Sequence, residues 1–150
     1  MLVKVIAQFI RGAEQAVPQD HSEATYCHLI EKEDGCLDWN RSAEEIERAV
    51  RAYQSWPHAF TTLVGRQLIV DEAGVEAAGE PDHPLPAGIG APQVGSVVRV
   101  DKRRGILVHT GAGRLLITRV QLQGKRPMDA AAFANGFPQL ADSVLGGNAT

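Results

Sequence analysis

Apolar residues recur at helical spacing in the first third of the chain. Four of them, at i, i+3, i+4 and i+7, form one buried stripe of a predicted helix: Ile46, Ala49, Val50 and Tyr53. The helix begins after Ser42, because Ser42 and Glu45 have the spacing of a capping box, and Pro57 ends any continuation. We expect the stripe to pack against strand residues such as Ile69 and Leu116.

A second helical pattern opens the chain. Apolar residues share one broad face over residues 2–10, and Arg11-Gly12 supplies a stop. A helix of about ten residues is marginal alone in water, so this one must dock on another surface. Residues 13–24 show no periodicity and predict an extended connector.

After Pro57 the pattern changes to short β-type runs. The predicted strands cover residues 59–63, 67–71, 96–100, 106–110 and 114–122. Val64-Gly65-Arg66 joins the first two as a hairpin turn, and glycine-containing turns join the last three into a meander. Five short strands suit a small closed or partly open barrel better than an open sheet. The predicted fold class is therefore mainly β with flanking helices.

Two more segments flank these strands. Residues 72–92 are rich in Ala, Gly, Glu and Pro, which predicts a long excursion on the surface. Residues 127–133 predict a final helix with Pro127 in its first turn, which residues 135–138 end.

The composition is that of a folded domain. Apolar residues make up 44% of the 150 positions and charged residues 22%, which excludes disorder of the whole chain. A chain of this length buries about 70% of its unfolded surface, so it needs no disulfide or metal to fold. Lys4 and Gln8 interrupt the first apolar segment and no long apolar run follows, so neither a membrane span nor a secretory signal is predicted. We expect a cytoplasmic protein with Cys27 and Cys36 reduced.

Charge is distributed unevenly along the chain. Residues 1–84 hold 7 Lys and Arg against 15 Asp and Glu, whereas residues 85–150 hold 8 against 3. Excess positive charge on a small barrel is typical of a surface that contacts a phosphate backbone. The candidate RNA-binding residues are Lys102, Arg103, Arg104, Arg114, Arg119, Lys125 and Arg126. Two strands separate the run 102–104 from the run 125–126, so the two runs are expected at the same end of the barrel.

The sequence gives little support to a metal site, a nucleophilic catalytic site or a phosphate-binding loop. Cys27, His28, Cys36 and Asp38 lack the close pair that forms a zinc corner, so no metal site is predicted. The five histidines are scattered, and no Ser/His/Asp grouping has the sequence of a nucleophile elbow. Residues 111–113 have the glycines of a phosphate loop but lie between two β runs, which indicates a hairpin turn.

A succession of short motifs resembles the C-terminal region of the methionyl-tRNA formyltransferases. The motifs that carry the resemblance are Val17-Pro18-Gln19-Asp20, Ala24-Thr25-Tyr26, Lys32-Glu33-Asp34-Gly35, Leu37-Asp38-Trp39, Arg51-Ala52-Tyr53, Trp56-Pro57 and Leu122-Gln123 with Gly124-Lys125-Arg126-Pro127-Met128. Their order and approximate spacing match the family from residue 1 to about residue 133.

The resemblance implies a division of the chain and a role for it. Residues 1–23 correspond to the last helix and linker of a catalytic domain, residues 24–137 to a barrel resembling an oligonucleotide-binding fold, and residues 138–150 to a poorly matched tail. In the family, the barrel binds initiator tRNA and the catalytic domain takes the formyl group from 10-formyltetrahydrofolate. This chain has no counterpart of the catalytic Asn, His and Asp, so we expect it to bind no cofactor and to be inactive alone.

Two other interpretations stay open. The barrel could be an accessory or spacer domain of another 10-formyltetrahydrofolate-dependent formyltransferase, or a stand-alone RNA-binding module. The positive second half disfavours a mere spacer, and the apolar first helix disfavours an autonomous protein.

Overall fold

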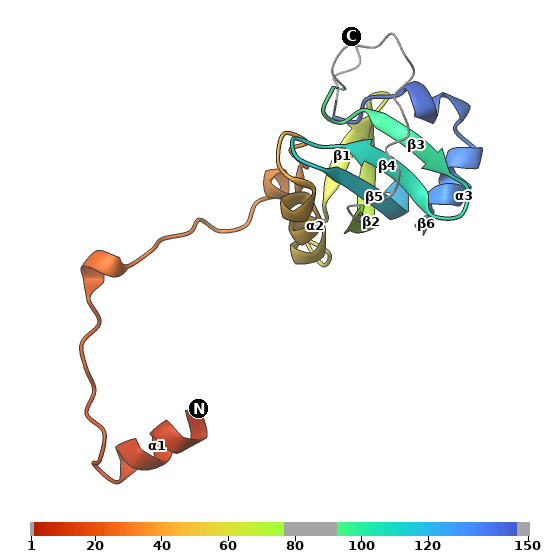
Figure 1. Ribbon diagram of the computed structural model, residues 1–150. Helices are drawn as coiled ribbons and strands as arrows, with labels where there is room; N and C mark the ends of the chain where they lie inside the picture. Colours follow the sequence, from red (N-terminus) through yellow and green to blue (C-terminus); the bar gives the residue numbers. More distant parts are fainter. Residues whose placement is uncertain (1, 77–92, 147–150) are drawn as a thin grey trace.

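A single antiparallel sheet dominates the computed structural model, which describes residues 2–76 and 93–146 (Figure 1). Its strands are β1 (Phe60–Leu63), β2 (Arg66–Val75), β3 (Val97–Asp101), β4 (Gly105–His109), β5 (Arg114–Leu122) and β6 (Met128–Asp129). Three α-helices accompany them, α1 (Leu2–Ile10), α2 (Ala43–Ala52) and α3 (Ala130–Asn135), with short 3-10 turns at His21–Glu23, Lys32–Gly35 and Pro138–Asp142. The mainly β class with flanking helices is confirmed.

The strands run in the order β1-β2-β5-β4-β3, with β6 paired to β5. The first hairpin turns at Val64 and Gly65, whose positive φ angles of 48° and 71° are those of a type I′ turn. The later strands form the predicted meander, and pairing between β2 and β5 joins it to the hairpin. The extra strand β6 makes six strands among the described residues, where five were predicted.

The chain's last described segment connects the two edges of the sheet. Beside β3, the Val97 amide donates to the Ser143 carbonyl (3.0 Å) and the Leu145 amide to the Gly95 carbonyl (2.8 Å). Beside β1, the Gly146 amide donates to the Thr62 carbonyl (2.9 Å). The sheet is thereby closed into a barrel, and residues 138–146, set apart above as a tail, take part in the closure.

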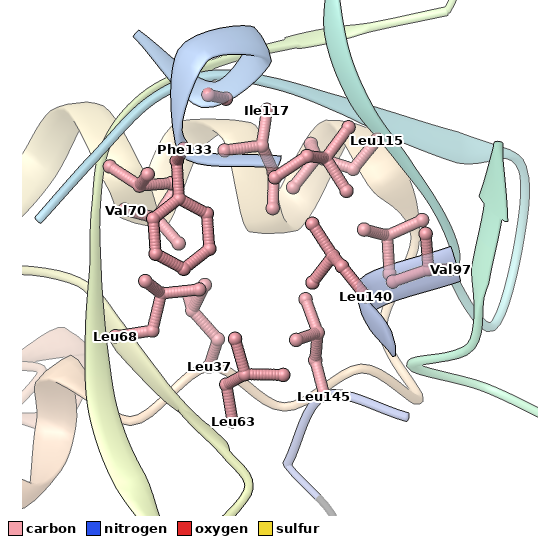
Figure 2. Close-up of a cluster of buried hydrophobic side chains, with 14 of the residues drawn as sticks. Leu37, Leu63, Leu68, Val70, Val97, Leu115, Ile117, Phe133, Leu140 and Leu145 are labelled. Carbon is pink, nitrogen blue, oxygen red and sulfur yellow. The ribbon is translucent and has the colours of Figure 1, made fainter. Parts of the chain in front are cut away.

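The barrel encloses one apolar core, shown in Figure 2. Leu63, Leu68 and Val70 face Leu140 and Leu145 of the closing segment across it. Leu140 and Leu145 are only 1% and 2% exposed, so the closing segment is anchored by burial as well as by hydrogen bonds.

Helix α2 forms as predicted. The Ser42 hydroxyl accepts from the Glu45 amide, and the Glu45 carboxylate accepts from the Ser42 amide, which completes the capping box. Ile46 and Val50 are buried in the core, whereas Tyr53 is only half-buried.

The prediction that Ile69 and Leu116 receive the α2 stripe is wrong by one position. Both residues are half-buried and lie outside the core cluster. Their neighbours Leu68, Leu115 and Ile117 supply the core instead. Side chains of a strand alternate between its two faces, so an error of one residue selects the opposite face.

Two predicted boundaries also move because of strand pairing. Strand β2 continues to Val75, which pairs with Leu115, so the predicted excursion does not begin at residue 72. The remainder of that excursion, residues 77–92, lies outside the described residues. The final helix begins at Ala130 rather than at Pro127, because Met128 and Asp129 first pair with Val120 and Arg119.

The N-terminal arm, residues 2–31, lies apart from the barrel (Figure 1). Helix α1 has the predicted bounds, and none of its residues is buried. Val3 is 82% exposed and Ile10 is 79% exposed, so the apolar face of this helix has no cover in the structure.

Candidate nucleic-acid interface

The connection from β5 to β6 presents two cations to solvent. Gly124 adopts a φ of 76°, and the Lys125 amide donates to the Leu122 carbonyl (2.8 Å) to close a tight turn. The Gln121 side chain donates to the Lys125 carbonyl (2.8 Å) and fixes the turn from the strand. Lys125 and Arg126 are exposed.

A third cation joins this turn from a distant part of the sequence. The Gln123 amide donates to the Gln67 carbonyl (2.9 Å), so the β1–β2 hairpin lies directly beside the turn. The Arg66 guanidinium then donates through Nη2 to the Gln123 carbonyl (3.2 Å). We call Arg66, Lys125 and Arg126 the basic cluster; within residues 2–76 and 93–146, no carboxylate forms an ion pair with any of them.

Arg66 was not among the residues predicted from the sequence. It stands in the acidic half of the chain, next to a hairpin turn, with no basic neighbour in sequence. The local sequence therefore gives no signal. Only the pairing of β2 with β5 brings it to Lys125 and Arg126.

The β3–β4 turn holds its cations in a different setting. The Asp101 carboxylate accepts from the amides of Arg103 (2.8 Å) and Arg104 (3.0 Å), and these bonds lower the pKa of Asp101. Lys102 and Arg103 are exposed and Arg104 is half-buried. All three line a hollow of about 480 Å³ together with the carboxylate residues Glu72 and Asp129.

The two remaining predicted arginines lie among carboxylates. Arg114 approaches Glu76 at 3.5 Å, and Arg99 approaches the other oxygen of the same carboxylate at 3.8 Å. Arg119 is paired across the sheet with Glu72 on one side and Asp129 on the other. In the structure, then, the seven predicted residues divide into the exposed pair 125–126 and five cations with acidic neighbours.

The two basic turns lie at the same end of the strands but are staggered. Ile106 pairs with Ile117, which puts the β3–β4 turn near Thr118, whereas β5 runs on to Leu122 before its own turn. Leu122 lies four residues beyond Thr118 along β5, a distance of about 14 Å at 3.4 Å per residue. The turns thus form two surfaces rather than one.

No group of three or more His, Cys, Asp and Glu side chains that could hold a metal ion is found among the described residues. Cys27 and Cys36 are free and exposed. His28 instead pairs with Asp34 at 3.1 Å. None of the described helices is both long enough and apolar enough to cross a membrane.

Comparison with known proteins places this barrel in a family. Residues 29–138 match the family described as formyl transferase, C-terminal domain. The chain belongs to this family. The match covers α2, α3 and all six strands, so the barrel is the family's C-terminal domain, and helix α1 precedes it.

Similar proteins carry this C-terminal domain as part of a longer chain. The methionyl-tRNA formyltransferase of Treponema denticola is 34% identical over 144 residues, which is 95% of this chain and 42% of the relative. That of Sorangium cellulosum is 39% identical over 137 residues, 91% of this chain and 41% of the relative. The chain therefore spans about two fifths of the length of these relatives.

A solved structure supports the fold. A variant of HypX from Aquifex aeolicus superimposes with a TM-score of 0.56 at 19% identity, over 92% of this chain and 23% of that one. At that identity the likeness concerns the formyltransferase C-terminal fold alone.

Proposed function

We propose that this chain is the tRNA-binding portion of a methionyl-tRNA formyltransferase, acting on initiator tRNA in the cytoplasm. One observation carries the proposal: the basic cluster is an exposed cationic surface that forms no ion pair with a carboxylate of the described residues, on a domain whose relatives bear that enzyme's name. Lys and Arg in such a setting neutralise phosphates, and the released counterions drive association. Such contacts position an RNA without distinguishing its sequence.

In this proposal the chain supplies binding, and the chemistry belongs to another domain. A catalytic domain holds 10-formyltetrahydrofolate and transfers the formyl group, while this chain alone binds no folate and transfers nothing. The exposed apolar face of α1 fits a role in docking against that domain. Incubation of the isolated chain with charged initiator tRNA and the formyl donor is expected to give no formylated product above background.

Charge reversal tests the RNA-binding part of the proposal. The variant Lys125→Glu/Arg126→Glu is expected to weaken tRNA binding tenfold or more at low salt, and to reduce the log–log salt slope by about two units. The effect should be equal for initiator and elongator tRNA, because phosphate contacts carry no sequence information. Filter binding from low to moderate salt measures both quantities.

The matched control is Lys102→Glu/Arg103→Glu, which makes the same change in net charge on the other turn. Because Glu72 and Asp129 already border that turn, we expect a loss of less than about threefold. Equal salt slopes for the parent and the Lys125→Glu/Arg126→Glu variant would reject the proposal and favour a spacer domain.

A further inference from the structure

The barrel carries an uncharged outer face beside the basic cluster. In β1 and β2 the buried residues alternate with half-buried ones. Leu63, Leu68 and Val70 point into the core, as Figure 2 shows. Phe60 and Ile69 therefore point to the opposite side of the sheet.

Strand register arranges the outward residues in two rows. Phe60 pairs with Ile69, and Ile69 pairs with Gln121. In the second row, Thr62 pairs with Gln67, and the Gln123 amide binds the Gln67 carbonyl. Directly opposed residues share a face, so the rows form one continuous surface. We call it the amide face: Phe60, Thr62, Gln67, Ile69, Gln121 and Gln123.

The amide face and the basic cluster are joined by two hydrogen bonds. Gln121 donates to the Lys125 carbonyl, and Arg66 donates to the Gln123 carbonyl. The cations therefore stand along one margin of the amide face, whose six residues carry no charge. Beyond the opposite margin the same strands continue to Asp71 and Arg119. Gln123 is exposed and the other five residues are half-buried, so the face is accessible to a ligand.

The chemistry of this surface is complementary to nucleobases. A base offers a π face that stacks on an aromatic ring, and edges that exchange hydrogen bonds with amides. Phe60 provides a ring, and the glutamines at 67 and 123 provide both donors and acceptors. A polyanion held at the margin would have its bases within reach of these groups.

We propose that the amide face binds unpaired bases of the RNA whose phosphates the basic cluster holds. This inference rests on the proposed function and adds a base-binding surface to it. RNA is the occupant we favour, because the adjoining charge is positive and lacks carboxylate partners among the described residues.

The test compares ligands with and without bases. The full chain is titrated with a ten-nucleotide oligoadenylate, with purified tRNA and with inorganic polyphosphate. The variant Phe60→Leu/Gln67→Ala should lose about fivefold to tenfold in affinity for the oligonucleotide, while polyphosphate binding and the salt slope stay unchanged. Phe60→Tyr keeps the ring and should retain the parent affinity.

Controls separate this inference from the proposed function. Val75→Ala, at the far end of β2, should change neither the oligonucleotide affinity nor the polyphosphate affinity. Circular dichroism melts check that each variant folds. If Phe60→Leu/Gln67→Ala is unstable, Gln67→Ala alone should still lose about threefold, the effect of one hydrogen bond.

Unchanged oligonucleotide affinity in the amide-face variants, with loss in Lys125→Glu/Arg126→Glu, would overturn the base-binding inference and leave the proposed function standing. Unchanged affinity in Lys125→Glu/Arg126→Glu would instead reject the proposed function. If the amide-face variants sediment differently from the parent chain but bind RNA with the same affinity, the amide face is a surface for a protein partner, and the inference is overturned.

Discussion

The β3–β4 turn and the β5–β6 turn both look basic in the sequence, but the fold gives them different surroundings. The first brings Lys102, Arg103 and Arg104 next to carboxylates from β2 and β6. The second brings Lys125 and Arg126 next to Arg66. Strand pairing, rather than the count of basic residues, therefore decides which turn presents uncompensated charge.

After Lys125 and Arg126, the largest effect is expected at Arg66, the third exposed cation of the basic cluster. Arg66→Glu should weaken tRNA binding about fivefold and reduce the salt slope by about one unit, because it replaces one phosphate contact with repulsion. Filter binding at several salt concentrations measures both. Arg66→Lys preserves the charge and should stay within about twofold of the parent. Equal losses in the two variants would indicate that Arg66 acts by holding the Gln123 carbonyl and not by its charge.

A smaller effect is expected from the acids around the β3–β4 turn. Glu72→Gln/Asp129→Asn removes two negative charges from the hollow and should raise tRNA affinity about twofold to threefold at low salt. In that background, Lys102→Glu/Arg103→Glu should become more harmful than it is in the parent. The control Asp20→Asn removes a carboxylate from the N-terminal arm and should leave affinity unchanged. If Lys102→Glu/Arg103→Glu weakens tRNA binding equally in the parent and in the Glu72→Gln/Asp129→Asn background, Glu72 and Asp129 do not cause the difference between the two turns.

The sequence predicted the elements whose signals are local. The capping box at Ser42 and Glu45 specifies where α2 begins, and the hairpin at 64–65 needs only a turn with positive φ. The meander was predicted because tight turns join consecutive strands. In each case residues a few positions apart determine the structure.

Features that depend on distant pairing were missed. Strand β6 forms because Met128 lies beside Val120. The barrel itself was predicted, but its closure by the segment that brings Leu145 to Gly95 was not. The seven candidate cations were identified from charge, which carries no information on their neighbours. Arg66 was therefore omitted, and the acidic partners of Arg114 and Arg119 could not be foreseen.

The smallest effect concerns Asp71, a carboxylate on β2 near Arg119. Its Oδ2 is buried and accepts no hydrogen bond in the described part of the chain. Burial raises the pKa of Asp71 above its ordinary 3.8, although the charges of His58 and Arg119 oppose that rise. An acid whose pKa rises on folding stabilises the fold when protonated, and this stability is lost as pH increases through the raised pKa.

Asp71→Asn should therefore raise the melting temperature at pH 7, and the gain should shrink as the pH falls toward 4. The expected gain is about 1 kcal/mol or less, because the side chain is only partly buried.

Asp101 provides a control of opposite sign in the β3–β4 turn, since backbone hydrogen bonds lower its pKa and its charged form stabilises the fold. Asp101→Asn should lower the melting temperature at pH 7. This decrease should be smallest at acidic pH, where the native Asp101 carboxylate is itself protonated. Thermal melts of both variants across this range make the comparison, and tRNA affinity of Asp71→Asn should stay within about twofold of the parent, because Asp71 lies apart from the basic cluster. A constant gain for Asp71→Asn at every pH would trace its effect to packing rather than to the buried charge.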